Sequence, residues 1–361
     1  MLSDWEALTA HSWMEDAKDT EAFLHVLSAS RRMRDVRASF YANERSEIVE
    51  KQFSAVTLTF PAADGEVAYL AYRGTDGSFA GWKEDFNLCF KEVIPSQCTA
   101  AAYLSGVASA LACPLIVGGH SKGGNLAVYS AAKSSGEIQE RIVAVHNNDG
   151  PGFAWDISET PGHKRIASRI HTILPQTSVV GMLMEHEKRY QVVHSTYDGL
   201  YQHDGFSWQV LGTQFVHLDD FSREGKLVDE TLSSWADSLN TQQREALADA
   251  LYSVFTASGA KSAQRAHRGK LKAPQAMLRP IKTSTAETRR MVTEAFMLFF
   301  KLGTEELCPR TRRRKEAARS KIFEKRSRNN TRNWWSARSK YNIPAARGVR
   351  FPLHSAGQRD K

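Results

Sequence analysis

Residues 115–127 read Leu-Ile-Val-Gly-Gly-His-Ser-Lys-Gly-Gly-Asn-Leu-Ala. The first three form an all-apolar run, which is typical of a strand buried on both faces of a parallel sheet. An alanine-rich stretch that favours a helix begins at Asn125. Between the two lies Gly-x-Ser-x-Gly, in which Gly119 and Gly123 flank Ser121. This pattern predicts a strained strand-to-helix turn, because a Cβ at either glycine would collide with the adjoining strand or helix.

A turn of this kind has a chemical use. It lifts the serine hydroxyl above the edge of the sheet and points the N-terminus of the following helix at a developing oxyanion. Ser121 is therefore the candidate nucleophile. A structural glycine-rich turn stays open as the alternative, since Gly-x-Ser-x-Gly alone should recur by chance in roughly one chain in ten of this length.

The flanking sequence alternates between short β-prone runs and helical stretches. We predict strands at 53–60, 67–72, 115–117, 142–146, 170–174, 190–193 and 206–211, and helices at 96–112 and 125–134. We also predict helix over residues 5–50 and two amphipathic helices around 227–239 and 247–255. The alternation indicates an α/β fold with a mostly parallel central sheet flanked by helices.

Two backbone N–H groups are candidates for an oxyanion hole. One is that of Lys122, directly after the serine, and the other belongs to a loop that follows an earlier strand. Thr75, in the segment Tyr-Arg-Gly-Thr-Asp at residues 72–76, is the natural choice for the second. An ordinary β-turn with a polar tip would explain the same residues.

The general base is expected to be a histidine downstream of the serine. His203 lies in the segment Tyr-Gln-His-Asp-Gly, which we predict as a turn at the far end of the sheet. A solvated loop histidine stays open as the alternative. The acid is harder to assign, because residues 175–178 after the predicted strand 170–174 contain no carboxylate. Asp149, one strand earlier, is the best substitute. A turn in which Asp149 bonds its own backbone, or a dyad assisted by Ser178 or water, stays open.

Composition divides the chain. It has 361 residues, 48 Lys and Arg against 40 Asp and Glu, and 42% hydrophobic residues, which excludes wholesale disorder and collagen-like repeats. Residues 261–361 hold 27 basic and 7 acidic residues, a net charge of +20, and residues 1–260 carry −12. Four scattered cysteines, no signal peptide and no apolar run of ~18 residues predict a cytoplasmic protein without a transmembrane segment. The histidine and cysteine spacings predict no metal site and no cofactor.

We accordingly expect four parts. These are a helical segment packed on the core (1–50), an α/β-hydrolase domain (51–258), a basic linker with a helix at 286–302 (259–308), and a basic disordered tail (309–361). Trp334 and Trp335 lie among the arginines of the tail. Three readings stay open for it: a solvated extension, a segment that binds an anionic membrane surface, and a segment that binds nucleic acid.

Several motifs together resemble a bacterial family of lipase-like proteins, the Mbeg-like group, itself similar to the class 3 triacylglycerol lipases. They are Arg-Gly-Thr (73–75), Trp-Lys-Glu-Asp (82–85), the glycine-flanked serine turn with its helix (119–127), Asp-Gly-Pro-Gly-Phe (149–153), Ser-Val-Val-Gly (178–181) and Gln-His-Asp (202–204). The resemblance covers roughly residues 20–255. It implies an α/β-hydrolase core with Ser121 as nucleophile, His203 as base, Thr75 and Lys122 as oxyanion donors, and Asp85 bracing the oxyanion loop.

Two departures from the class 3 pattern bear on the substrate. Those lipases carry an aspartate in the stretch that matches residues 177–180, and they carry a helical lid after Arg-Gly-Thr, for which residues 76–81 are too short. A small ester, a phospholipid or an acylated metabolite therefore fits better than a long-chain triglyceride. The sequence predicts a serine esterase, with a catalytically silent hydrolase-fold binding protein as the alternative.

Overall fold

The computed structural model describes residues 17–223 except Asp64, together with scattered residues between 225 and 250 and between 285 and 293. These residues belong to one compact unit that covers residues 1–303. Among them, no helix is both long and apolar enough to cross a bilayer.

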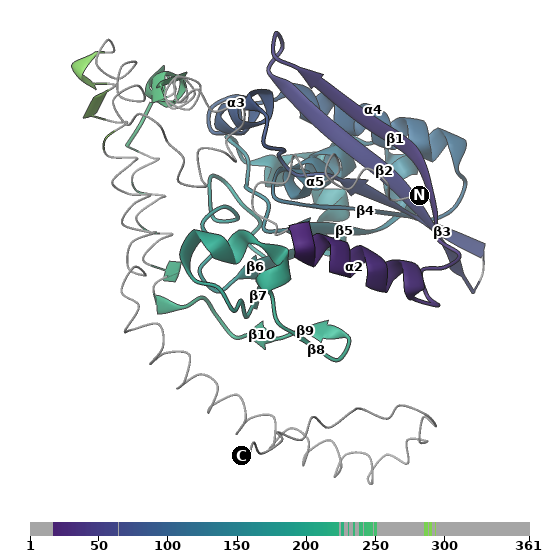
Figure 1. Ribbon diagram of the computed structural model, residues 1–361. Helices are drawn as coiled ribbons and strands as arrows, with labels where there is room; N and C mark the ends of the chain where they lie inside the picture. The colour runs from purple at the N-terminus through teal and green to yellow at the C-terminus, as the bar shows by residue number, and fades with distance from the viewer. Residues whose placement is uncertain are drawn as a thin grey trace, which may run out of the picture. The chain divides into compact units, whose positions relative to one another are not determined.

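An eight-stranded sheet forms the centre of the fold (Figure 1). Its strands lie in the order β1-β2-β3-β4-β5-β6-β7-β10, so the first seven are neighbours in chain order. The pairings from β3 to β7 are parallel, and β1, β2 and β10 pair antiparallel with their neighbours. The strands are β1 (Arg37–Ser46), β2 (Lys51–Ala62), β3 (Gly65–Tyr72), β4 (Leu115–His120), β5 (Ile142–Asn148), β6 (Ile170–Pro175), β7 (Tyr190–Val193) and β10 (His217–Leu218).

Helices connect the parallel strands. The α-helices are α2 (Ala17–Ala29), α3 (Phe79–Leu88), α4 (Pro95–Ala110), α5 (Lys122–Lys133), α6 (Gly136–Arg141) and α7 (Pro161–Ile166). Short 3₁₀ helices are η1 (Ile157–Glu159), η2 (Ala167–Arg169), η3 (Gly199–His203) and η4 (Gly205–Ser207). The α/β architecture predicted from the alternation of strands and helices is confirmed, with a largely parallel sheet and flanking helices.

The core lies where α4 and α5 pack on each other and on the sheet. Leu115 and Val117 of β4 are fully buried, as an all-apolar central strand requires. Small side chains such as Ala100 of α4 and Ala127 of α5 are also fully buried and let the two helices approach closely. Nearly all of α5 is enclosed, from Lys122 to Ala132. The helix that begins beside Ser121 is thereby fixed in position.

The glycines beside Ser121 leave no room for a side chain. A Cβ on Gly119 would lie 2.4 Å from the carbonyl carbon of Gly123, and one on Gly123 would lie 2.2 Å from the carbonyl oxygen of Tyr72 at the end of β3. Real Cβ atoms do not approach backbone so closely, so β3, β4 and α5 could not keep this spacing. The fold therefore contains the close contacts that require glycine at both positions, as the sequence pattern predicts.

We expect Gly123→Ala to destabilise the protein by about 1–3 kcal/mol or more, because backbone on both sides of the new methyl group must shift. Gly106→Ala is the matched control: Gly106 lies within α4, and a Cβ there would meet nothing within 4 Å. In an exposed helix position that change should stabilise the fold by about 0.5–1 kcal/mol. Urea denaturation of both variants measures the difference, and equal stabilities would contradict the packing described for the turn.

Two predictions of secondary structure were wrong. Residues 37–46 are not helical; they form edge strand β1, whose partner is β2. The run 206–211 is not a strand of the central sheet. Its first part is η4, and its end forms β8 (Val210–Leu211), which pairs with β9 (Gln214–Phe215) in a separate two-stranded sheet. Neither run shows a sequence pattern that specifies its partner strand.

Several predictions fall partly or wholly on residues outside the described part of the chain. They concern residues 1–16, most of the two amphipathic helices around 227–239 and 247–255, most of the helix at 286–302, and the basic tail at 309–361.

Candidate active site

Ser121 occupies a strained position between β4 and α5. Its φ is 58° and its ψ is −133°, a combination that a residue with a side chain rarely adopts and that costs on the order of 1–3 kcal/mol. Hydrogen bonds on both sides hold it: Ser121 N donates to Asn148 O at 3.0 Å, and Gly124 N donates to Ser121 O at 2.8 Å. The residue is half-buried rather than enclosed, so the strained turn presents the serine at the surface of the site.

The loop after β3 reaches this turn through Gly74. A Cβ on Gly74 would lie 2.8 Å from His120 O and 3.2 Å from Ser121 Cβ, so only glycine permits the approach. Thr75 follows directly, and its Oγ1 donates to Asp85 Oδ1 of α3 at 2.6 Å. The structure thus brings the Thr75 loop beside Ser121 and joins the Thr75 side chain to Asp85 of α3.

The structure also brings His203 and Asp149 together. Asp149 follows β5, and its Oδ2 lies 2.7 Å from His203 Nδ1 at the end of η3. Both side chains are almost completely removed from solvent. An aspartate in contact with Nδ1 fixes the orientation of the imidazole and leaves Nε2 available for chemistry. The histidine tautomer with a proton on Nδ1 is the one that donates in this contact.

Two donors from the loop after β6 hold the Asp149 carboxylate. Its Oδ1 accepts hydrogen bonds from Ser178 Oγ and from Gly181 N, the latter at 3.2 Å. Residues 176–181 after β6 therefore contain no carboxylate but bind the one that follows β5. The same loop meets η3, because Thr177 N donates to Gln202 Oε1 at 2.9 Å.

His120, the residue before the serine, packs against His203. Their ring centroids are 4.5 Å apart, and His120 Nε2 lies 2.7 Å from His203 O, which makes the neutral ring the donor. Desolvation by burial, together with the neighbouring His203, lowers the pKa of His120 from 6.5 to about 4. A neutral His120 thus supports the main chain of the candidate base at physiological pH.

This lowered pKa has a consequence for stability. The unfolded chain binds a proton at His120 near pH 6.5 and the folded protein near pH 4, so the stability contributed by the neutral ring is lost as pH falls through that window. The loss amounts to about 3 kcal/mol at most. We expect His120→Gln, which keeps a donor, to lose less stability between pH 7 and 4.5. Urea denaturation at several pH values measures this, and parallel pH profiles would contradict it.

The pKa of Asp85 also shifts on folding, and its effect on stability has the opposite pH dependence. This effect cancels when the His120 variant is compared with the parent protein. Burial raises the pKa of Asp85 to about 6, against the lowering effect of Lys122 and of the hydrogen bond from Thr75. Since the neutral form is favoured in the folded state, the Asp85 contribution to stability is present below its unfolded pKa and is lost as pH rises towards 6. Both the parent and the His120 variant carry Asp85, so their difference isolates His120.

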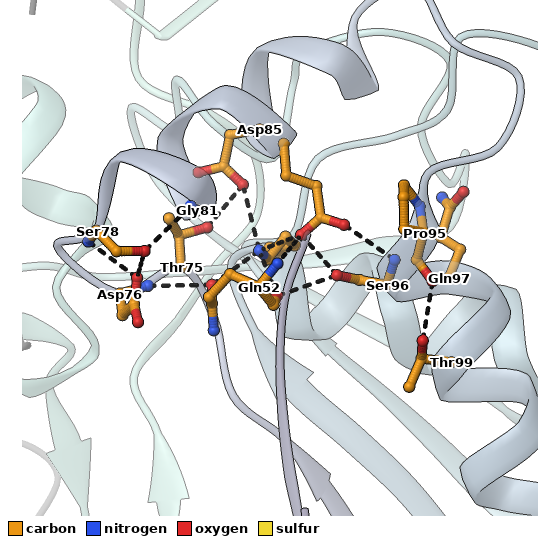
Figure 2. A network of polar contacts seen from close by, with 12 residues as sticks. Gln52, Thr75, Asp76, Ser78, Gly81, Asp85, Pro95, Ser96, Gln97 and Thr99 are labelled. Carbon is orange, nitrogen blue, oxygen red and sulfur yellow. Dashed lines mark hydrogen bonds and ion pairs between the residues drawn. The ribbon is translucent and has the colours of Figure 1, made fainter. Parts of the chain in front are cut away.

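Beneath the Thr75 loop lies a buried polar network (Figure 2). Lys122, the first residue of α5, directs its ammonium into this network and pairs with Glu84 of α3 at 2.9 Å. Gln52 of β2 and Ser96 of α4 complete it. As the first helical residue, Lys122 also has a backbone N–H that the helix itself does not use.

Sequence reasoning assigned Ser121, His203, Asp149, Thr75 and Lys122, and the structure gathers the elements that bear them at one edge of the sheet. It missed the roles of His120, Gln52 and Glu84. The sequence did hold a signal for Glu84. Lys122 lies at the start of a buried helix, a buried lysine requires a carboxylate partner, and the motif at 82–85 offers one. Among the described residues, no group of three or more His, Cys, Asp and Glu side chains is placed to hold a metal ion.

A family model identifies the family of this chain. No curated protein matches the chain. A solved structure, described as the crystal structure of M37 lipase, aligns with a TM-score of 0.34 and 9% identity over 79% of this chain and 92% of that one. The model of the Mbeg1-like family matches residues 27–253, which is more than half of the chain and includes every residue of the candidate site. The chain therefore belongs to the Mbeg1-like family.

Proposed function

We propose that this protein is a serine hydrolase that cleaves a carboxylic ester through an acyl-enzyme on Ser121. The contact between His203 Nδ1 and Asp149 Oδ2, beside the strained turn that bears Ser121, is the observation that carries the proposal. A merely structural turn would not need a buried imidazole–carboxylate pair next to it. Ser121, Asp149 and His203 follow one another in the order serine, acid, histidine, which serine hydrolases of this architecture use.

The reaction proceeds in two halves. Ser121 Oγ attacks the ester carbonyl carbon while His203 Nε2 takes the hydroxyl proton, and the intermediate then collapses as the C–O bond to the alcohol breaks and the alcohol receives that proton. Water next attacks the acyl-enzyme and gives a proton to His203, which returns it to Ser121 as the carboxylic acid leaves. Asp149 stabilises the imidazolium in both halves.

The backbone N–H groups of Lys122 and Thr75 would hold the oxyanion. Both stand beside Ser121: one begins the helix after it, and the other follows Gly74, which lies against it. The Thr75 hydroxyl is already engaged with Asp85, so its backbone N–H is the group left to donate. Each such donor typically accounts for 10²–10³-fold in rate.

A small ester, a phospholipid or an acylated metabolite suits the site better than an oil droplet. Only Asp76, Gly77 and Ser78 separate Thr75 from the start of α3, and Asp76 binds both Ser78 and Gln52. This short, hydrogen-bonded connection leaves no room for an inserted lid helix.

The test is hydrolysis of a panel of p-nitrophenyl esters from acetate to palmitate by the full chain. We expect turnover of the short and medium esters, with kcat/KM falling for the longest chains presented as emulsions. A serine-directed phosphonate should abolish that turnover. Absence of turnover across the panel, with no reaction of the phosphonate, would favour the silent binding protein instead.

A further inference from the structure

The side chain of Lys122 is one of the most deeply buried charges among the described residues. Only 1% of it is exposed, and its partner Glu84 is 0% exposed. Lysine is almost never fully enclosed unless its three ammonium protons are satisfied. Here they are: Lys122 Nζ donates to Gln52 O at 2.9 Å, to Gln52 Oε1 at 2.8 Å and to Glu84 Oε2 at 2.9 Å.

The acceptors of this ammonium reach the Thr75 loop. Gln52 Oε1 also accepts from Asp76 N at 3.2 Å, so one amide oxygen joins the loop to Lys122. Asp85, which accepts from Thr75 Oγ1, lies 4.0 Å from the same ammonium. Figure 2 shows Gln52 between Asp76 on one side and Ser96 on the other.

The side chain of Gln52 makes its hydrogen bonds through Oε1. Its Nε2 is buried and finds no hydrogen-bond partner among the described residues. Leaving such a donor unpaired costs about 1–3 kcal/mol. In this orientation the amide oxygen accepts from both the Lys122 ammonium and the Asp76 N–H. We infer that this bridge offsets the unpaired donor.

Glu84 fixes the far end of the network. Its two oxygens accept from Gln52 N and Ser96 N, each at 2.9 Å, in addition to the ammonium. The carboxylate thereby joins α3, β2 and the start of α4. Lys122 is thus attached to a rigid frame rather than to a mobile surface group.

Resting on the proposed function, we propose that the Lys122 side chain is a positioning residue that holds the Thr75 loop and the start of α5 at a fixed spacing, so that both oxyanion donors face one point. Lys122 then acts twice: its N–H donates to the oxyanion, and its ammonium places the opposite donor. A buried ion pair is a weak means of stabilising a fold, since apolar residues of similar volume often serve as well. An apolar side chain could not, however, connect three acceptors on two segments.

The test variant is Lys122→Met combined with Glu84→Gln, which removes both charges together and avoids an uncompensated buried carboxylate. We expect the variant to fold, with kcat for a short ester reduced about 10²-fold and KM changed less than about threefold, since one misplaced oxyanion donor affects the transition state. Gln52→Leu is the second variant. It removes only the amide bridge, and a smaller loss of kcat is expected.

Hydrogen exchange measured by mass spectrometry reports how firmly the Lys122 network holds residues 73–78, and it does not require enzyme activity. In the double variant the amides of residues 73–78 should exchange faster, while those of β6 and β7 stay unchanged. Unchanged exchange at 73–78, or an unchanged kcat in a variant whose exchange is faster, would overturn the proposal. If the double variant does not fold, the same two readouts on Gln52→Leu decide.

A matched control is available in another buried contact between a histidine and a carboxylate. His163 of α7 contacts Glu187 at 2.6 Å, with 4% and 14% of the side chains exposed, and neither residue lies on an element that bears a proposed donor. His163→Gln with Glu187→Gln should lower stability but leave kcat and exchange at 73–78 unchanged. An inactive wild-type protein would refute the ester hydrolase, whereas the exchange experiment would still decide whether Lys122 holds the loop.

Discussion

Ser121→Ala is expected to reduce kcat/KM for a short p-nitrophenyl ester by on the order of 10⁵–10⁶-fold, because the nucleophile, base and acid act as one unit. The residual rate would come from the oxyanion donors and from substrate binding. The fold should survive, since the hydrogen bonds that hold the turn use the backbone N and O of Ser121, which alanine retains. Steady-state kinetics with matched protein concentrations measure the effect, and circular dichroism checks the fold.

The double variant Ser121→Ala, His203→Ala provides the internal control. Because each single change already disables the unit, the double variant should be no slower than Ser121→Ala alone. Retention of most activity in Ser121→Ala would show that the measured hydrolysis does not use this serine. Additive losses would show that His203 acts on some other step.

Asp149→Asn should be the next most damaging change and lower kcat by about 10⁴-fold. The amide retains the shape of the carboxylate but cannot accept from His203 Nδ1 and stabilise the imidazolium in the same way. It also allows the imidazole to adopt the wrong tautomer. The reaction rate of the variant, measured from pH 6 to 10, should remain low at neutral pH.

Ser178→Ala distinguishes the role of Asp149 as the acid from the role of Ser178, which only donates to it. Ser178 is one of two donors to Asp149 Oδ1, and Gly181 N remains in the variant. We therefore expect a loss of about 10- to 100-fold, as is usual when a residue acts by orienting another. A loss as large as that of Asp149→Asn would contradict the assignment of Asp149 and favour the dyad assisted by Ser178.

The strands near Ser121 could be predicted because their local sequence pattern matches their environment in the sheet. Leu115 to Val117 is apolar without interruption and is followed by glycines, so its place at the centre of a parallel sheet follows from burial on both faces. β7 was predicted with its observed bounds, Tyr190–Val193. Local pattern and tertiary environment agree in these segments.

Strand β1 could not be predicted in the same way. Most of its residues are exposed, and charged residues such as Arg37, Glu44 and Arg45 interrupt any alternation. Its conformation comes from the hydrogen bonds of an edge pairing with β2, which no single-strand pattern encodes. Tertiary pairing therefore overrode the helical appearance of the segment.

The polar network beneath the site was also beyond sequence reasoning. Gln52, Glu84 and Lys122 are separated by 32 and 38 positions, and only the meeting of β2, α3 and α5 brings them within hydrogen-bond distance. The position of Asp149 beside His203 depends likewise on the parallel neighbours β5 and β6. Sequence could name the candidates for acid and donor, but the three-dimensional arrangement alone could show which groups meet.

Covalent labelling distinguishes an activated Ser121 from a merely structural one. A fluorophosphonate reacts with a serine only when a base activates it and an oxyanion hole accepts the phosphoryl oxygen. The full chain is incubated with the reagent at pH 8, its intact mass is measured, and the modified peptide is sequenced. We expect a single adduct on Ser121 that is lost in His203→Ala and strongly slowed in Asp149→Asn. An unmodified protein, or an adduct on another serine that survives His203→Ala, would contradict it.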